Sequence, residues 1–99
     1  MPYFIETWDN EEQKHLRAEH RNAHLAYLDA NKHRIIACGG KLLDDGSRAT
    51  GAVLLVDVET REEAEAFIAE DPFTKAGLVG KVSMSRWRRA FVNGERYTE

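Results

Sequence analysis

The nine residues TGAVLLVDV (50–58) limit the fold more than any other stretch of this chain. A β-strand directs successive side chains to opposite faces of its sheet, and a strand with one solvated face therefore alternates apolar and polar residues. Here both alternating sets are apolar: Ala52, Leu54, Val56 and Val58 on one face, and Val53 and Leu55 on the other. The sequence therefore predicts a sheet that is covered on both sides.

Three further stretches have the composition of strands. Residues 2–8 (PYFIETW) are rich in aromatic residues and end at Asp-Asn, and residues 34–43 (RIIACGGKLL) end at the turn sequence DDGS. Residues 78–87 (LVGKVSMSRW) form the last apolar run of the core. Together with residues 50–58, these stretches predict four strands.

Two helices are expected between these strands. Asn10 can cap the first helix, with Gln13 as its reciprocal partner. This helix is expected to run to about Asn31, because one set of side chains recurs at spacings of three and four: Leu16, His20, Ala23 and Tyr27. The second helix begins at the T-x-x-E capping box of Thr60 and Glu63. Its apolar face consists of Ala64, Phe67 and Ile68.

The order strand, helix, strand, strand, helix, strand is typical of an α+β, ferredoxin-like βαββαβ fold. In that fold two helices cover one face of an antiparallel four-stranded sheet. The second apolar face then needs another partner, and a two-fold homodimer that packs sheet against sheet supplies it. We therefore expect a dimer of one domain over residues 1–99, with a core at 2–88 and a C-terminal extension at 89–99. The Asn-Gly pair of the extension predicts a hairpin.

Composition narrows the classes of function. A net charge of −3 argues against a nucleic-acid partner, because phosphate binding needs a basic face. The basic cluster RWRR (86–89) is expected to be solvated at the rim of the dimer. No apolar run approaches the roughly 20 residues that span a bilayer, and no signal peptide is visible. A single cysteine, Cys38, fits a reducing compartment, for which we expect the cytoplasm, and is expected to be a small buried hydrophobe.

Two long stretches resemble the YCII-related (YciI-like) family: NAHLAYLDANKHRIIACGGKLLDDG (22–46) and TGAVLLVDVETREEAEAFIAEDPFTKAGLV (50–79). The most specific piece is the segment EDPF followed by AGL. The resemblance implies the fold of muconolactone isomerase and other dimeric α+β barrels. It also implies an active site with a histidine–aspartate pair, which falls on His24 and Asp71. Relatives that act on chlorinated hydroxyquinols and lactones imply a dehydrohalogenase or isomerase chemistry.

The position of Asp71 agrees with this pairing. At 1.5 Å per residue the first helix is about 33 Å long, and a second helix that runs back along it ends level with His20 and His24. By the same count Asp9 is about 20 Å from His24. Asp71 also precedes Pro72 and a glycine, the pattern of an N-cap, a proline at the first helical position and a glycine stop. A carboxylate can cap a helix and still accept from an imidazole, so both roles stay open.

Four residues are expected to bind a substrate beside this pair: His20, Tyr27, Gly39 and Gly40. Each has an alternative. His20 and His24 could hold a metal ion with a carboxylate. Tyr27 could belong to the core, and a glycine pair inside a strand could mark a β-bulge. His15 and His33 lie off the apolar stripe and are expected to be solvated.

Two functions from different classes are compatible with these patterns and with the resemblance, which alone implies the histidine–aspartate pair. The first is an enzyme in which His24 removes or relays a proton on a small cyclic oxygenated substrate while Asp71 orients the imidazole. The second is a non-catalytic dimeric module that binds a small molecule or supports another enzyme. The sequence assigns no metal, no cofactor and no membrane partner to either function.

Overall fold

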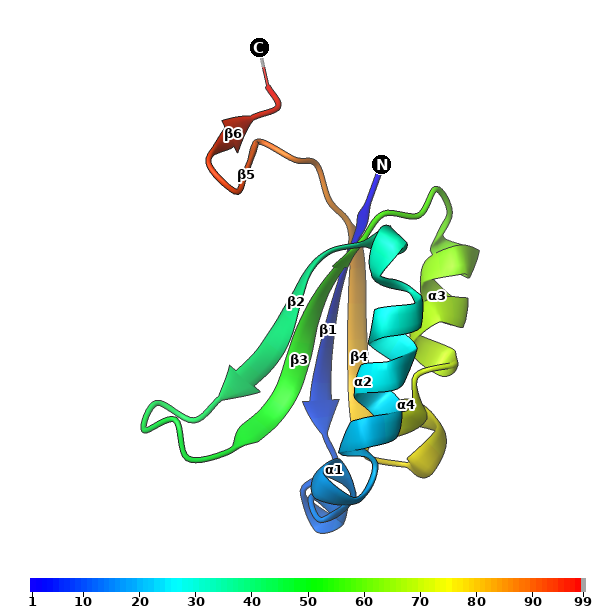
Figure 1. Ribbon diagram of the computed structural model, residues 1–99, viewed down its shortest axis with the longest axis vertical. Coiled ribbons are helices and arrows are strands. Elements are labelled where there is room, and N and C mark those ends of the chain that lie inside the picture. Colours follow the sequence, from blue (N-terminus) through cyan, green and yellow to red (C-terminus); the bar gives the residue numbers. More distant parts are fainter. Residues whose placement is uncertain (99) are drawn as a thin grey trace.

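Four strands form one antiparallel sheet in the computed structural model, which describes residues 1–98. The strands are β1 (Tyr3–Asp9), β2 (Ile35–Leu42), β3 (Ala49–Val56) and β4 (Val79–Arg86). They lie in the order β2-β3-β1-β4, with the helices on one face of the sheet (Figure 1). The predicted ferredoxin-like α+β fold is confirmed, and the strands begin and end close to their predicted bounds.

The second predicted helix begins where its capping box indicates. It forms α3 (Arg61–Ala69), and the hydroxyl oxygen of Thr60 accepts a hydrogen bond from the N–H of Glu63 at 3.2 Å. A short helix, α4 (Pro72–Ala76), follows with Asp71 as its N-cap. It ends at a glycine with a φ of 93°, a left-handed conformation that glycine adopts without a steric penalty.

The first predicted helix is interrupted. In place of one helix over residues 10–31, the chain forms four short segments: η1 (Glu11–Gln13), α1 (Leu16–Glu19), α2 (Arg21–Ala30) and η2 (Lys32–Arg34), of which η1 and η2 are 3-10 turns. The prediction of a continuous helix is wrong because His20, with φ of −107° and ψ of 8°, leaves the helical conformation. The chain therefore changes direction at His20 before α2 crosses the sheet.

Asn10 caps only the first of these segments. Its side chain accepts a hydrogen bond from the N–H of Glu12 at 3.2 Å. Its own N–H donates to the carbonyl of Leu78 at 2.7 Å, so this donor is not available to Gln13. The predicted reciprocal bond is wrong because a tertiary contact with the residue before β4 takes its place.

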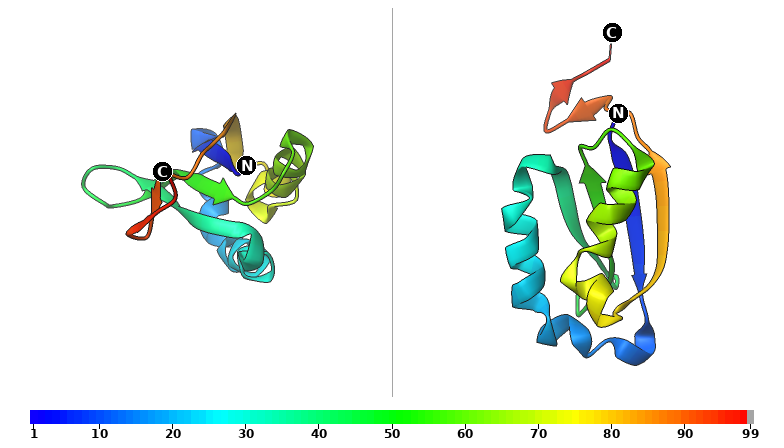
Figure 2. Two further views of the ribbon diagram at one scale, coloured as in Figure 1. Left: turned by 90° about the horizontal axis from the view of Figure 1, so that it is seen from above. Right: turned by 90° about the vertical axis from the view of Figure 1, so that its right-hand side faces the viewer.

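The core lies between the sheet and the helices. Figure 2 shows α2 and α3 side by side and running in opposite directions, as the sequence predicts. The register places Tyr3 opposite Val56 and Ile5 opposite Leu54, so that the buried side chains of β1 and β3 form one apolar layer. The core cluster consists of Tyr3, Ile5, Leu54, Val56, Val58, Ala64, Phe67 and Ile68.

No helix of residues 1–98 covers the other face of the sheet (Figure 2). On that side the register places Phe4 opposite Leu55 and Glu6 opposite Val53, and all four residues remain partly exposed. We call Phe4, Val53 and Leu55 the open face. A single chain therefore leaves part of its second apolar layer in contact with water.

The C-terminal extension forms a separate hairpin of β5 (Phe91–Val92) and β6 (Glu95–Arg96). Its turn residues Asn93 and Gly94 have φ values of 52° and 81°, the positive values that the Asn-Gly pair predicts for a tight hairpin turn. The hairpin stands away from the main sheet (Figure 1). It does not extend that sheet within residues 1–98.

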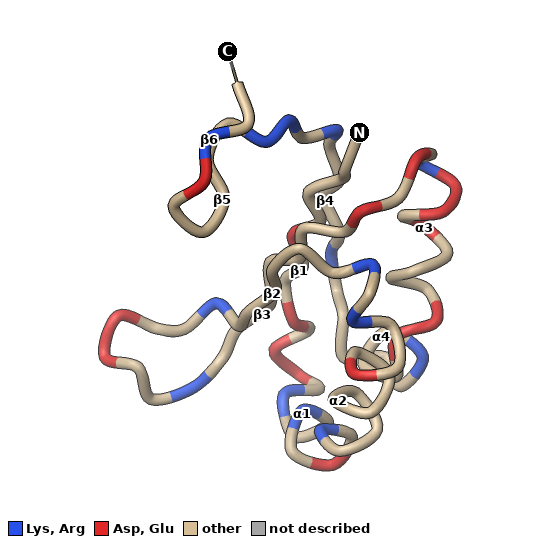
Figure 3. Tube along the Cα trace, turned by 45° about the horizontal axis from the view of Figure 1, so that its top comes forward, with Lys and Arg blue, Asp and Glu red and all other residues tan. Residues whose placement is uncertain are grey.

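The basic cluster at residues 86–89 lies where β4 leads into the C-terminal hairpin (Figure 3). Arg86 donates to the hydroxyl of Tyr3 at 3.0 Å, and Arg89 lies 3.4 Å from a carboxylate oxygen of Asp57. Arg88 is exposed, so only part of the cluster has the solvated character that the sequence predicts. Among the helices of residues 1–98, none has the length and apolar character needed to cross a membrane.

Candidate active site

Asp71 lies between α3 and α4 and is buried, with 3% of its surface exposed. Its backbone is extended, and its Oδ1 atom accepts a hydrogen bond from the N–H of Phe73 at 2.9 Å. Pro72 follows as the first helical residue, where its missing N–H costs no hydrogen bond. The capping geometry that the sequence predicts for Asp71 is therefore present.

His24 approaches the same carboxylate from α2. Its Nδ1 atom lies 2.8 Å from Asp71 Oδ1, so a single oxygen both caps α4 and contacts the imidazole. The side chain of His24 is 15% exposed and that of Asp71 is 4% exposed. An ionised carboxylate only accepts hydrogen bonds, so this contact to an ionised Asp71 requires the proton on Nδ1 and leaves Nε2 as the unprotonated nitrogen of a neutral imidazole.

Phe73 holds the imidazole from a second direction. The two rings are stacked, with centroids 4.0 Å apart and planes inclined by 14°. Phe73 is itself buried as the second residue of α4. One short helix therefore supplies both the stacking surface and, through its N-cap, the hydrogen-bond acceptor that keep His24 in a fixed orientation, as a general base requires.

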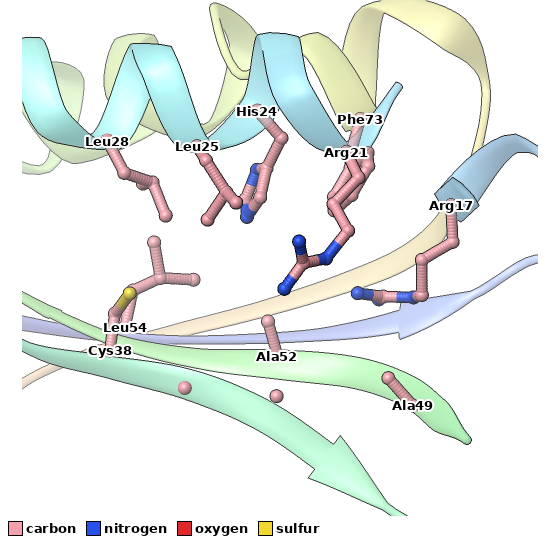
Figure 4. Close-up of a pocket in the computed structure, with 12 residues that line it drawn as sticks. Arg17, Arg21, His24, Leu25, Leu28, Cys38, Ala49, Ala52, Leu54 and Phe73 are labelled. Atoms are coloured by element: carbon pink, nitrogen blue, oxygen red, sulfur yellow. The ribbon is translucent and has the colours of Figure 1, made fainter. Parts of the chain in front are cut away.

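The imidazole lines a cavity of about 360 Å³ between α2 and the strands β2 and β3 (Figure 4). This volume suits a small organic ring. Leu25 and Leu28 line the helix side, whereas the sheet side has short side chains at Ala49 and Ala52. The cavity is mainly apolar, and its titratable groups come from α1, α2 and β2.

Sequence reasoning missed three of the side chains that line this cavity: Arg17, Arg21 and Phe73. The available signal was spacing, because residues 17, 21 and 24 recur at intervals of four and three on one side of the predicted helix. The stripe of Leu16, His20, Ala23 and Tyr27 predicts a different inward face for that helix. The kink at His20 removes the regular periodicity on which that interpretation depends.

The structure divides the four predicted substrate-binding residues into two pairs. Gly39 and Gly40 line the cavity, whereas His20 and Tyr27 do not. The hydroxyl of Tyr27 donates to the carbonyl of Phe67 at 2.7 Å, on the side of α2 that faces α3. Burial raises the pKa of Tyr27, which keeps the phenol protonated.

The β-bulge interpretation of the glycine pair is wrong. The register of β2 with β3 shifts at residues 35–37 and 41–42, whereas Gly39 and Gly40 pair regularly between these points and have no positive φ. A Cβ atom on Gly40 would meet Ala49 Cβ at 3.7 Å and Gly51 O at 3.8 Å, which are ordinary contacts. A Cβ atom on Gly39 would meet nothing within 4 Å. Neither the backbone nor the packing requires glycine here. The missing side chain of Gly40 leaves space on the cavity side of β2, and that of Gly39 leaves space on the opposite face, beside Val53.

Cys38 is exposed, and its prediction as a buried hydrophobe is wrong. It lies on β2 at the edge of the sheet, where no further strand of residues 1–98 covers it, and it lines the cavity. Partial burial against the cavity wall, and to a lesser extent the negative charge of Asp71, raise the pKa of its thiol. At neutral pH the group is therefore a thiol rather than a nucleophilic thiolate.

The alternative of a metal site at His20 and His24 lacks a further ligand. Residues 1–98 contain no group of three or more His, Cys, Asp or Glu side chains that could hold a metal ion. Nδ1 of His24 already contacts Asp71 at 2.8 Å. His15 and His33 are exposed, as the sequence predicts.

Comparison with known proteins supports the resemblance seen in the sequence. The profile of the YCII-related domain matches residues 1–88. None of the curated proteins matches the chain. A similar solved structure is 5-chloro-2-hydroxyhydroquinone dehydrochlorinase (TftG) from Burkholderia phenoliruptrix, in complex with 2,5-dihydroxybenzoquinone. It is 34% identical, with a TM-score of 0.81, and the match covers 89% of this chain and 94% of that chain. The chain therefore belongs to the YCII-related family.

Proposed function

We propose that this chain is a cofactor-free enzyme that moves a proton on a small cyclic oxygenated substrate, in a reaction of the isomerase or dehydrohalogenase type. The observation that carries the proposal is the 2.8 Å contact between His24 Nδ1 and Asp71 Oδ1, with the imidazole at the wall of a cavity of about 360 Å³. The similar dehydrochlorinase gives independent support, because it acts on a chlorinated hydroxyhydroquinone and its complex holds a small oxygenated ring.

In this proposal His24 is the catalytic base and Asp71 its positioning residue. Nε2 of the neutral imidazole takes a proton from an O–H or C–H group of the ring, and the bonding electron pair stays on the substrate. In a dehydrohalogenation the reacting form is the keto tautomer of the ring, in which the halogen-bearing carbon is tetrahedral and carries a hydrogen. The electron pair then moves into the ring while the carbon–halogen bond breaks, and the halide leaves with the electrons of that bond. In an isomerisation the imidazolium returns the proton to a different ring atom. Asp71 stabilises the imidazolium in both cases.

Two properties of the whole protein belong to the same proposal. The first is a homodimer in which the open face packs against its own copy around a two-fold axis. Its support is that Phe4 and Leu55, which pair across neighbouring strands, are apolar and only partly buried. This packing leaves the cavity, which lies on the helix side of the sheet, on the outside of the dimer. The second is a cytoplasmic location, supported by the free thiol of Cys38.

Chloride release from 5-chloro-2-hydroxyhydroquinone tests the proposed reaction. We expect turnover by the wild type and a loss of about 100-fold or more in His24→Asn, because general-base catalysis contributes about 10²- to 10⁴-fold. The exposed His33 provides a matched control, and His33→Asn should turn over like the wild type. Equal turnover by His24→Asn and the wild type would show that His24 is not the base. If the wild type binds the ring in a thermal-shift assay but releases no chloride and forms no isomer, the chain is the non-catalytic binding module instead.

A further inference from the structure

Two arginines bring positive charge to the cavity that contains His24. Arg17, from α1, and Arg21, from the first turn of α2, both line it. Figure 4 shows both side chains extending from the helices toward the sheet, on the same side of the cavity as Phe73. The guanidinium of Arg17 binds a carboxylate of the protein, whereas that of Arg21 does not. Arg17 therefore has a structural role, and Arg21 is left to bind a ligand.

Arg17 is fully engaged by the protein. Its Nε and Nη2 atoms donate to the two carboxylate oxygens of Asp9 at 2.9 Å and 2.8 Å. The side chain of Asp9 is only 1% exposed, so Arg17 supplies the counter-charge that a buried carboxylate needs. Its guanidinium also lies 4.9 Å from the centroid of Phe73. Arg17 therefore anchors α1 to the sheet, and its charge is balanced.

Arg21 has no such partner. Within residues 1–98 no hydrogen bond or ion pair joins its guanidinium to another side chain. The residues three and four positions from Arg21 carry no negative charge: they are Arg17, Ala18, His24 and Leu25. Asp71, the carboxylate that contacts His24, is buried and already accepts from His24 and from the N–H of Phe73.

An unbalanced cation at an apolar cavity has a chemical consequence. Arg21 is itself exposed, so water is excluded from its guanidinium only when a ligand fills the mainly apolar cavity beside it. An anion bound there then gains more from Arg21 than it would at an open surface, because interactions of a charge strengthen where water is partly excluded. A planar guanidinium also presents several N–H donors to one oxyanion. Residues 21 and 24 lie three positions apart on α2 and so face the same side of the helix. A ring oxygen bound to Arg21 therefore places a neighbouring part of the same ring beside His24.

We propose that Arg21 binds an oxyanion attached to the substrate ring, and that the substrate class of this site is the ionised hydroxyl compound, a phenolate or an enolate, rather than a neutral ring. This inference rests on the proposed function, since it concerns the same cavity. Arg21 favours the anion over the neutral ring hydroxyl. The proton of that hydroxyl goes to solvent or to His24 Nε2, and its electron pair remains on the ring, where it can drive the departure of a halide or a proton shift.

Two ring probes of equal size separate charge from shape. 2,5-Dihydroxybenzoquinone is a vinylogous acid that is ionised at neutral pH, whereas 2,5-diaminobenzoquinone has a similar outline and no charge. Calorimetric titration of both into the wild type, Arg21→Gln and Arg88→Gln measures the contribution of the charge. Arg88 is exposed, lies outside this cavity and serves as the matched control for loss of one positive charge.

We expect Arg21→Gln to weaken binding of the dihydroxy probe about tenfold or more, which is the range for a hydrogen bond to a charged group, and binding of the diamino probe less than twofold. Arg88→Gln should bind both probes like the wild type. Added salt should weaken binding of the dihydroxy probe to the wild type and have less effect on Arg21→Gln. The melting temperature of Arg21→Gln should not fall, because its guanidinium stabilises nothing within residues 1–98.

Equal affinity of the wild type and Arg21→Gln for the dihydroxy probe would overturn the assignment of Arg21. The same conclusion would follow if the wild type bound neither probe, or bound the diamino probe as tightly as the dihydroxy probe. The proposed reaction has a separate readout, because chloride release that depends on His24 but not on Arg21 would preserve the proton transfer and remove only the anion site.

Discussion

His24 Nδ1 and Asp71 Oδ1 lie 2.8 Å apart although 47 positions of the chain separate the two residues. The same oxygen accepts the N–H of Phe73 at 2.9 Å. The orientation of the imidazole and the start of α4 therefore depend on one atom. Substitutions at position 71 can separate the two roles, because asparagine caps a helix about as well as aspartate does but carries no charge.

Asp71→Asn should leave the melting temperature nearly unchanged, whereas Asp71→Ala should lower the free energy of unfolding by about 1 kcal/mol through loss of the cap. Asp71→Asn replaces the carboxylate with an amide, which can present either an acceptor or a donor to His24. The Nδ1–H tautomer is then no longer selected. Nitrogen-15 NMR of the imidazole should show a mixed tautomer, and chloride release should fall. An unchanged tautomer in the folded variant would show that Asp71 is only a cap.

Gly40→Val should block the cavity without harming the fold. A Cβ on Gly40 makes only ordinary contacts, and valine favours strands. We expect the affinity for 2,5-dihydroxybenzoquinone to fall at least tenfold while the melting temperature stays the same or rises. Gly39 borders the cavity through its backbone, but a side chain at this position points to the opposite face of the sheet, beside Val53, so Gly39→Val is the matched control. If Gly39→Val and Gly40→Val impair binding equally, the ring does not lie against the Gly40 side of β2.

Sedimentation should give a mass of about twice 11.3 kDa at micromolar concentration, because a dimer buries the open face. Leu55→Lys should shift the mass toward the monomer, since it places a charge in the centre of that face. Leu43, which is 41% exposed in the connection between β2 and β3, is a suitable control, and Leu43→Lys should remain dimeric. A well-folded wild-type monomer would contradict the proposed assembly.

Cys38 should react slowly with iodoacetamide at neutral pH. Burial and, to a smaller degree, Asp71 raise the pKa of its thiol, so at any given pH it has a smaller thiolate fraction than a free cysteine. The alkylation rate should therefore continue to rise at pH values where a free thiol has reached its plateau. Asp71→Asn should lower this pKa and speed the reaction, and 2,5-dihydroxybenzoquinone in the cavity should slow it. Alkylation at pH 7 faster than that of free cysteine would contradict the raised pKa.

The sequence by itself determined the number and bounds of the four strands of the main sheet and the starts of α3 and α4. The two apolar faces of residues 50–58 require covering on both sides, and Thr60 and Asp71 cap the helices that follow them. These features are predictable because their physical causes are local. The side chains of a strand alternate between two faces with a period of two residues, and an N-cap side chain binds a backbone N–H no more than three residues away. The resemblance, together with the rise per helical residue, also brought His24 and Asp71 to the same level of the fold.

Only the tertiary structure decided how the site is lined. The kink at His20 and the bond between the Asn10 N–H and the Leu78 carbonyl depend on where the sheet ends, and neither leaves a periodic trace in the sequence. Arg17 and Arg21 differ because Asp9, a residue of β1, accepts hydrogen bonds from Arg17 and not from Arg21. The sequence does not distinguish two arginines four positions apart. The interaction of each arginine with Asp9 depends on the distance between the two charges, and only the folded chain fixes this distance.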